Sequence, residues 1–583
     1  MEYSSCIKLN DLPNEILMII LKNLHTIDVL YSLVGVDKRL NAFVNDSIFT
    51  KYLTLMSSSP TGLSYSFTDK ILDRFCDEIL PEIHHKIEWL NVAPPSIERI
   101  LVSTNYPNLH GLGLYDLSSD TAMDLFTDGS FFIRIFKNQI LSLVINIKKY
   151  KEPIRAFEDI NKFIFTQIFT MFSNLQYLDF DPSFNNCHIL SFGASPPNVF
   201  SCTLSKLNVM IDTYSDCLYL LDGRFNQLHT FYVTIRDFSH WVPTAINNEK
   251  KLINLKCFSL KHTTYLTVYN QFLVPLLHRM SNLEELSLFF LNHNGAFIDG
   301  DNLAKNTIGH MTKLNKFAFD IRTIISFVKL LNLPSYKEFQ NTFRHFEKIQ
   351  IISCIDYFQK ASECYCHMYS YPYTLKYYKD ITNNFTRGLF ECVREISLFD
   401  ERPFEHEFFL EIARSFPFLE KIILHNREPQ MYYGQQWPII EYPHLTQLDL
   451  VRTHHSYVEQ FLNNTKMSLL NNIYLYVNYH GLQIVCNPYK LLSRRIIKHS
   501  LLREALQRTH SSHNMIVSYS KPRVIIEVEP VRLPVIKIDP YKYNQMSSAE
   551  KQRLMQHAPF QHEPQYLSRN QSSRTSYDSD KMN

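Results

Sequence analysis

The sequence predicts an α/β protein, in which a short group of helices precedes a long stack of helix–strand units. Two observations lead to this prediction. Residues 12–44 place apolar side chains at helical spacing, and residues 80–480 repeat one short apolar pattern at steps of mostly 22 to 32 residues. Because a unit of about 26 residues cannot bury both of its faces alone, the units must stack on one another.

Composition narrows the class of protein before any motif is considered. The chain has 583 residues and a net charge of +2, which gives no electrostatic footprint for a nucleic acid or an anionic membrane. It has only 13 glycines, and Gly111-Leu112-Gly113 lacks the third glycine of a phosphate-binding loop. We therefore expect no nucleic acid, no membrane and no cofactor among its partners.

Cysteine usage and the first residues bear on the compartment. The 11 cysteines are scattered without paired spacing, which is typical of free thiols in a reducing environment. Residues 1–20 lack the basic start of a signal peptide, and the apolar run 16–21 is too short to span a membrane. The sequence thus predicts a cytoplasmic or nuclear location.

Three short helices are predicted near the start of the chain. Pro13 suits the first turn of a helix, Thr26 is placed to cap the second helix, and Asp37 is placed to cap the third. A unit of about 40 residues rarely buries enough surface to fold alone, and surplus apolar surface usually marks a partner site. The alternative is that these helices only cap the end of the repeats that follow.

This segment resembles an F-box over roughly residues 9–50. The family pattern is a Leu-Pro pair, an acidic residue, an apolar helix, an Asp-to-Leu stretch, and an apolar residue before two basic ones. Here these positions are Leu12, Pro13, Glu15, the helix 16–24, the stretch 28–30, Val36, Lys38 and Arg39. The chain has Asp37 and Leu40 where many F-boxes carry Cys or Ser and Trp.

The resemblance implies a partner for the surplus apolar surface. F-box helices dock onto the Skp-type adaptor of an SCF (Skp–cullin–F-box) ubiquitin ligase, which connects them to the cullin and RING subunits. Such docking has the physics of other contacts made by amphipathic helices. The residues implied to contact the adaptor are Leu12, Pro13, Ile16, Leu17, Ile20, Leu24, Leu30, Leu33, Val36 and Leu40.

The repeated pattern is an aromatic residue or Met, two further residues, an apolar residue, and then two apolar residues that alternate with others. Examples are "FSNLQYLDF" at 172–180, "MSNLEELSL" at 280–288 and "YPHLTQLDL" at 442–450. The alternation predicts a strand, and amphipathic runs such as 156–172 predict a helix before it. The first apolar residues, called anchors here, are Ile87, Leu109, Ile140, Leu175, Leu204, Leu228, Leu255, Leu283, Leu314, Phe346, Val393, Leu419, Leu445 and Leu470.

This pattern is similar to the leucine-rich repeat family in an irregular variety. It lacks the Asn or Cys that the family places after each strand. The resemblance implies a horseshoe-shaped solenoid in which the strands share one parallel sheet. A doubly wound α/β domain also alternates strands and helices, but its continuous Val/Ile strands and glycine-rich turns are missing from this sequence.

In a solenoid the concave face of the sheet is the usual binding surface. The residue between the last two apolar positions of each copy points to that face, because side chains alternate along a strand. We therefore expect a protein substrate to contact Asp179, Tyr232, Ser287, Gln350, Asp449 and Tyr474.

The long step between Phe346 and Val393 holds a tyrosine-rich insertion, 354–390. It is either a protruding binding loop or a degenerate extra repeat whose tyrosines are half-buried. Its Cys364, Cys366 and His367 are too close together in sequence to close a zinc tetrahedron readily, so no metal site is predicted. The chain also lacks the G-x-S-x-G, H-E-x-x-H and Walker motifs, so we expect no catalytic residues.

The predicted domains follow from these patterns. They are a helical F-box at 1–55, a linker into the repeats at 56–85, repeats at 86–480, a C-terminal cap at 481–540 and a disordered tail at 541–583. The predicted function is a non-catalytic substrate receptor of an SCF-type ligase, acting in ubiquitin-dependent degradation of a protein substrate whose identity stays open. The alternative is a repeat-based interaction scaffold without a ligase role.

Overall fold

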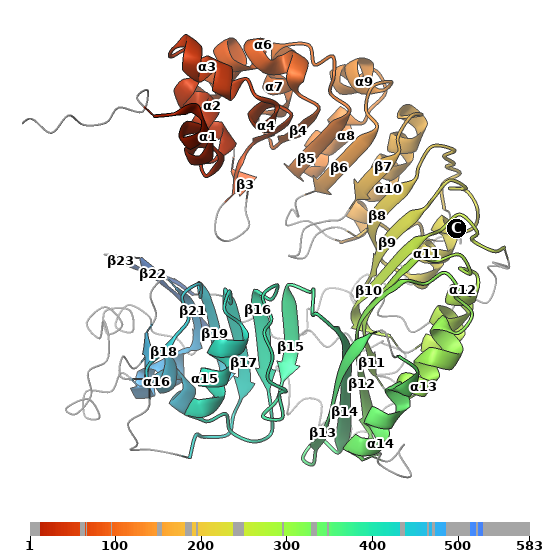
Figure 1. The fold of residues 1–583 in the computed structure, drawn as a ribbon, viewed down its shortest axis with the longest axis vertical. Helices are drawn as coiled ribbons and strands as arrows, with labels where there is room; N and C mark the ends of the chain where they lie inside the picture. The colour runs from red at the N-terminus through yellow and green to blue at the C-terminus, as the bar shows by residue number, and fades with distance from the viewer. Residues whose placement is uncertain are drawn as a thin grey trace, which may run out of the picture. The chain divides into compact units, whose positions relative to one another are not determined.

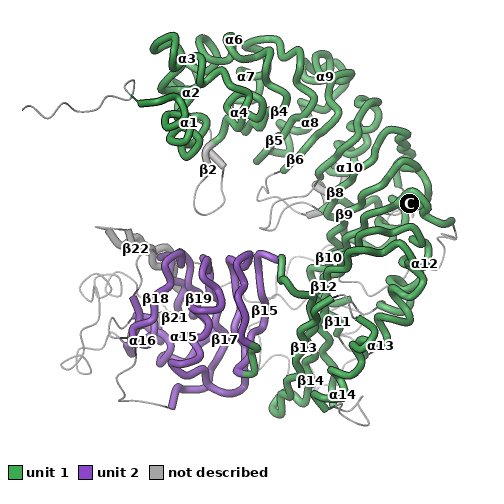
Figure 2. The backbone as a smooth tube through the Cα atoms, viewed as in Figure 1, with its two compact units in different colours: residues 1–374, 384–386 green, residues 375–383, 387–583 purple. Residues whose placement is uncertain are grey.

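The computed structural model describes residues 12–58, 64–65, 67–94, 96–147, 154–180, 189–193, 196–236, 250–266, 268–293, 297–327, 335–346, 349–431, 438–462, 466–468, 473–485, 514–520 and 523–528. The chain divides into two compact units (Figure 2). Unit 1 comprises residues 1–374 with 384–386, and unit 2 comprises 375–383 with 387–583. The range 86–480, predicted as one run of repeats, is thus shared between the two units.

A 12-stranded sheet dominates unit 1 and confirms the α/β prediction. From β1 to β12 each strand of this sheet is parallel to its neighbour, and these ten strands follow chain order. These strands are β1 (Tyr52–Leu55), β4 (Trp89–Val92), β5 (Gly111–Leu117), β6 (Ser142–Ile147), β7 (Tyr177–Phe180), β8 (Lys206–Ile211), β9 (Thr230–Ile235), β10 (Cys257–Tyr265), β11 (Glu285–His293) and β12 (Lys316–Ser326).

The anchors read from the sequence set the positions of these strands. A strand begins two residues after every anchor except Phe346 and Leu470. The anchors from Ile87 to Leu283 are all buried, and alternate residues of the following strand are buried beside them. In β8, for example, Leu207, Val209 and Ile211 face the core, which leaves alternate residues on the other face. The period of two therefore fixes which face of each strand is covered.

Helices cover that buried face, on the outer side of unit 1 in Figure 1. We call the opposite face, which carries Lys206, Asn208 and Met210 in β8, the open face. The covering helices are α5 (Asp69–Arg74), η2 (Phe75–Ile79), α6 (Leu80–Ile83), η3 (His84–Lys86), α7 (Ile97–Ser103), α8 (Ser119–Leu125), α9 (Phe131–Phe136), α10 (Ile154–Met171), α11 (Tyr214–Leu220), η4 (Tyr269–Leu273), α12 (Val274–His278), α13 (Gly300–Asn302), η5 (Leu303–Ile308), α14 (Tyr336–Asn341) and η7 (Thr342–His345).

The helices at the start of the chain share one hydrophobic core with this sheet. They are α1 (Asn14–Lys22), α2 (Thr26–Leu33), α3 (Lys38–Val44) and α4 (Ser47–Thr50). Asp37 caps α3 as predicted, accepting the Leu40 amide at 2.8 Å, but His25 rather than Thr26 precedes the first residue of α2. Their buried side chains continue without a break into those of β1 and of η2. The predicted linker 56–85 contributes to this core through Phe75 and Ile79, and it also holds the short strands β2 (Ser57–Ser58) and β3 (Ser64–Tyr65).

A ladder of side-chain amides joins successive repeats at the start of the strands. The residue before an anchor is often Asn, and it donates to a backbone carbonyl of the preceding repeat. The four asparagine bonds run from Asn108 to His85 (2.6 Å), Asn174 to Asn138 (3.2 Å), Asn254 to Asn226 (2.7 Å) and Asn282 to Ile253 (2.8 Å). The sequence has no Asn after each strand. The asparagines come before the strands instead, so their hydrogen bonds link successive repeats at the start of each strand.

Removing one rung of this ladder should weaken unit 1 measurably. We expect Asn254→Ala to lower the free energy of unfolding by about 0.5–1.5 kcal/mol, because the Asn226 carbonyl loses its donor. Urea denaturation followed by circular dichroism measures the change. The matched control is Asn138→Ala, whose exposed side chain makes no hydrogen bond in the described part of the chain. Equal effects of the two substitutions would contradict a specific role for the ladder.

The tyrosine-rich insertion is not a single protruding loop. Near its end, β15 (Tyr377–Ile381) pairs parallel with β16 (Glu395–Phe399), as the strand of an extra repeat would. Its earlier part is different. It forms an antiparallel hairpin of β13 (Gln350–Phe358) and β14 (Glu363–Tyr371), and β14 pairs antiparallel with β12. Tyr369 and Tyr373 are buried there. The hairpin ends the sheet of unit 1, which explains why the step after Phe346 is longer than the others.

Unit 2 contains a second, seven-stranded sheet that is parallel from β15 to β21. Its strands are β15 (Tyr377–Ile381), β16 (Glu395–Phe399), β17 (Lys421–Asn426), β19 (Gln447–Thr453), β21 (Tyr474–Asn478), β22 (Asn514–Ser520) and β23 (Arg523–Val528), and a separate pair is β18 (Ile440–Glu441) with β20 (Met467–Ser468). The helices are α15 (His406–Ser415), α16 (His455–Leu462) and α17 (Tyr479–Val485).

The C-terminal prediction is covered only in part. β22 and β23 lie within the predicted C-terminal cap, 481–540, and they pair antiparallel at the end of the second sheet. Residues 529–583, including the predicted tail from 541, lie outside the described residues.

Candidate functional site

An apolar surface remains exposed on the N-terminal helices. Along α1 and the turn after it, Ile16 is 44% exposed, Ile19 57%, Ile20 38% and Leu24 53%, and Val36 before α3 is 57% exposed. We call these five residues the helical apolar surface. Large aliphatic side chains this exposed and this close together in sequence are typical of a surface that another protein covers.

The ten residues predicted to contact an adaptor fall into two groups. Ile16, Ile20, Leu24, Val36 and Pro13 are exposed, and Leu12 and Leu33 are half-buried. The other three, Leu17, Leu30 and Leu40, are at most 4% exposed. Buried side chains cannot touch a partner directly, so these three support the helices from within.

Polar contacts fix the orientation of these helices on unit 1. Arg39, one of the two basic residues in the sequence pattern, donates from Nη2 to the Leu12 carbonyl at 2.5 Å and to Asn14 Oδ1 at 2.7 Å. Arg74 of α5 donates to the Val34 carbonyl at 3.2 Å and lies over the Tyr31 ring at 4.8 Å. The helical apolar surface therefore sits on a rigid base.

The open face of unit 1 is the second candidate surface. Asp179, Tyr232 and Ser287, predicted to bind substrate, lie in one row across the sheet. Neighbours in that row, as Cα partners on successive strands, are Thr54, Asn91, Gly113, Val144, Asp179, Asn208, Tyr232, Ser259, Ser287 and Ala318. The strand register thus places in one row three residues that span 108 positions of the sequence, from 179 to 287.

The other three predicted residues lie elsewhere. Gln350 belongs to the hairpin, where its partner is Tyr371. Asp449 and Tyr474 both lie in unit 2. The Cα partner of Tyr474 is Gln447, two residues before Asp449, so the two predicted residues do not lie in one row. The reason is that Leu470 is not the true anchor of its copy, since β21 starts four residues after it.

Tyrosines and one lysine form a cluster at the centre of the open face. The Tyr177 hydroxyl donates to Asp179 Oδ2 at 3.0 Å. The Lys206 ammonium lies 4.8 Å from the Tyr177 ring centre and 5.5 Å from that of Tyr232. Burial, with smaller contributions from Cys257 and Glu285, raises the pKa of Tyr232 to about 12. The Tyr232 hydroxyl is therefore neutral at physiological pH.

Trp89 extends this aromatic face onto β4 and β5. Its indole N–H donates to Asn91 Oδ1 at 2.7 Å, and Asn91 donates to Thr54 Oγ1 at 3.0 Å. The ring lies where the side chain of residue 111 would be, because a Cβ on Gly111 would come 2.0 Å from it. Gly111 and Gly113, which looked in the sequence like half of a nucleotide motif, instead make room for Trp89 and Asn91.

Filling this space should displace the indole. We expect Gly111→Ala to destabilise the protein by about 1–3 kcal/mol and to change its tryptophan fluorescence, because the ring must leave its position. Thermal unfolding and emission spectra measure both effects. Gly481→Ala is the control, since its Cβ would meet nothing closer than 3.9 Å. Unchanged fluorescence in Gly111→Ala would contradict the described position of Trp89.

A buried ionic cluster lies where β12 meets the hairpin. Asp320 accepts hydrogen bonds from His367 at 2.9 Å and from Tyr373 at 2.5 Å, and the Arg322 guanidinium is 3.4 Å away. Burial opposes the charge of Asp320, but Arg322, His367 and Tyr373 outweigh it and hold the pKa of the carboxyl well below its usual range. Asp320 and Tyr373 are buried and the side chains of Arg322 and His367 are 12% exposed, so we expect this cluster to stabilise the fold.

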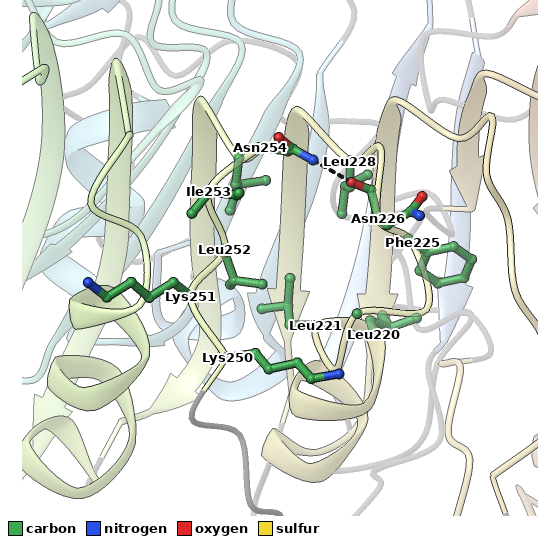
Figure 3. A pocket seen from close by; sticks show the side chains of 12 residues that line it. Leu220, Leu221, Phe225, Asn226, Leu228, Lys250, Lys251, Leu252, Ile253 and Asn254 are labelled. Carbon is green, nitrogen blue, oxygen red and sulfur yellow. Dashed lines mark hydrogen bonds between the residues drawn. The ribbon is translucent and has the colours of Figure 1, made fainter.

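A pocket of about 250 Å³ opens between the end of α11 and the segment before β10 (Figure 3). Its walls are mostly apolar, with Lys250 and Lys251 at one side. Arg279 holds both sides by donating to the Leu221 carbonyl at 2.7 Å and to the Lys250 carbonyl at 2.9 Å. The residues that line it include no Ser, Cys, His, Asp or Glu.

Comparisons with known proteins give no assignment. No protein-family model matches the chain, and no curated protein matches it. Among the described residues no three His, Cys, Asp or Glu side chains are grouped to hold a metal ion. Of the helices in the same part of the chain, none has the length and apolar character needed to cross a bilayer.

Proposed function

We propose that the chain is a non-catalytic substrate receptor of an SCF-type ubiquitin ligase. In this proposal the N-terminal helices are an F-box that docks onto a Skp-type adaptor, and the parallel sheets belong to an irregular leucine-rich-repeat solenoid that holds a protein substrate. The observation that carries the proposal is the helical apolar surface, which stays exposed although the opposite side of the same helices is buried.

The division of α1 into two faces supports docking over simple capping. Leu17 and Leu21 already bury one face of α1 against the chain, so the helix needs no further apolar residues to be held in place. Ile16, Ile19 and Ile20 nevertheless face solvent. Burying about three such side chains in a partner would contribute several kcal/mol, at about 1.5–3 kcal/mol for each.

The chemistry of such a receptor is proximity. The adaptor, cullin and RING subunits would carry the ubiquitin machinery, and the repeats would raise the effective concentration of a substrate lysine beside it. The receptor itself forms and breaks no covalent bond in this scheme, and the open face offers tyrosines and polar groups suited to a protein surface.

A turnover experiment separates this function from a scaffold without a ligase role. The full chain and a variant carrying Ile20→Asp and Leu24→Asp are expressed in cells, and captured proteins are compared for abundance and ubiquitin modification. Because both forms keep the open face, we expect both to capture the same proteins. Only the intact form should shorten their lifetimes. Equal lifetimes with the two forms would favour the scaffold.

Substitutions are preferable to a deletion in this test. Residues 12–50 share the hydrophobic core of the first sheet, so their removal would expose Leu53 and Phe75 and disturb the repeats as well. Ile20 and Leu24 contribute no buried side chain. Their substitution therefore changes the surface and leaves the core intact.

A further inference from the structure

Within the described part of the chain, the Asp179 carboxylate on β7 is hydrogen-bonded only to neutral groups. Its two oxygens each accept one hydrogen bond from a neutral donor, the Tyr177 hydroxyl at 3.0 Å and the Asn208 amide at 3.0 Å. No Lys, Arg or His of the described chain forms an ion pair with it. A carboxylate can accept about four hydrogen bonds, so Asp179 keeps unused acceptor capacity on the open face.

A second unused acceptor lies on the neighbouring strand. Asn146 on β6 is 6% exposed, and its Oδ1 has no hydrogen-bond donor in the described part of the chain. Asn146 is two residues beyond Val144, the Cα partner of Asp179, so strand alternation places it on the same face. A buried amide oxygen without a donor costs about 1–3 kcal/mol, which favours any ligand that supplies one.

The ammonium group of Lys206, which lies on this face, already contacts aromatic rings. Lys206 lies over the rings of Tyr177 and Tyr232, and it makes no ion pair with Asp179. Burial and then the charge of Asp179 raise the pKa of both Tyr115 and Tyr177, which keeps the two phenols protonated. The surroundings of Asp179 are thus rich in acceptors and aromatic rings and poor in positive charge.

We propose that Asp179, Asn146 and the rings of Tyr115 and Tyr177 form a subsite for the ammonium or guanidinium group of a lysine or arginine side chain on a bound protein. A guanidinium has five donors and no acceptor, so it supplies what both unused oxygens need. An acidic or phosphorylated side chain brings only acceptors and is repelled by Asp179. This inference rests on the open face being the substrate surface, and it adds that the substrate segment is basic.

Selection from a random peptide library tests the subsite without any ligase subunit. The full chain is immobilised, and bound peptides from a library of random 12-residue peptides are sequenced. We expect at least fivefold enrichment of Lys and Arg at one position. Asp179→Asn should abolish that enrichment, and Asp179→Lys should replace it with enrichment of Asp and Glu. The matched control is Asp124→Lys, an exposed position on the covering helix α8, which should leave the basic preference unchanged.

Two outcomes would overturn the inference. One is a library that yields no basic preference with the intact chain. The other is a basic preference that persists in both Asp179 variants. Asn146→Ala provides a second variant, for which we expect a partial loss of enrichment and no reversal. Adaptor binding plays no part in this selection, so failure of the subsite and failure of the ligase proposal are seen separately.

Discussion

Replacing Ile20 and Leu24 together by aspartate is expected to weaken adaptor binding by about 100-fold or more. Each side chain is a large aliphatic group of the helical apolar surface, and apolar contacts at the core of an interface are worth about 2 kcal/mol or more when lost. Aspartate also places a charge where the partner would exclude water. Competition binding between the intact chain and the variant, with purified adaptor, measures the ratio directly.

The control for this variant is Ile135→Asp on α9. Ile135 is 45% exposed, which is comparable to Ile20, but it lies outside the helical apolar surface. We expect it to bind the adaptor as the intact chain does. All three exposed positions should also leave the melting temperature nearly unchanged, because none of the side chains is buried. Equal loss of binding in the control would show that the effect is not local.

Asp320→Asn is expected to have the largest effect on stability, a loss of about 3–5 kcal/mol. The substitution removes the negative charge of the buried Asp320 and leaves the Arg322 guanidinium without this carboxylate. Urea denaturation followed by circular dichroism measures the loss. The matched control is Asp301→Asn, whose exposed ion pair with Arg344 at 3.0 Å should contribute no more than about 1 kcal/mol. Similar losses in both variants would contradict the described burial of Asp320.

The same cluster predicts that the free energy of unfolding depends on pH in the acidic range. Since the folded state holds the pKa of Asp320 below its ordinary value of 3.8, the unfolded state binds a proton more readily. The contribution of Asp320 is therefore complete at neutral pH and is lost as the pH falls through about 4 and below. The difference in unfolding free energy between the intact chain and Asp320→Asn should shrink over this range. A difference that is constant from pH 7 to pH 3 would rule out this linkage.

Much of the strand pattern could be predicted because one rule, an anchor followed by alternation, repeats along the chain. The strand β1 escaped that rule because Thr50, a polar residue, occupies the anchor position and is fully buried. The hairpin β13–β14 escaped because alternation alone does not distinguish an antiparallel strand from a parallel one. The helices were less predictable, since several are only one or two turns long.

The candidate surfaces were predictable to different degrees. Helical spacing predicted the apolar stripe of α1. That stripe is wider than one face of the helix, so it contains both the buried residue Leu17 and the exposed residue Ile20. Only the packing of the helix against the rest of the chain shows which of the two is exposed. Alternation placed Asp179 and Tyr232 on one face. Asn208, the Cα partner of Asp179, was missed, and so was Trp89 farther along the same face, because cross-strand register depends on pairing between distant segments.

The most direct measurement is a calorimetric titration of purified Skp-type adaptor into the full chain at two temperatures. The helical apolar surface predicts saturable binding at one adaptor per chain, with a more negative enthalpy at the higher temperature because apolar area is buried. The Ile20→Asp and Leu24→Asp double variant should give no saturable signal. Absence of binding by the intact chain at tens of micromolar, with separate elution of the two proteins in size-exclusion chromatography, would contradict the account.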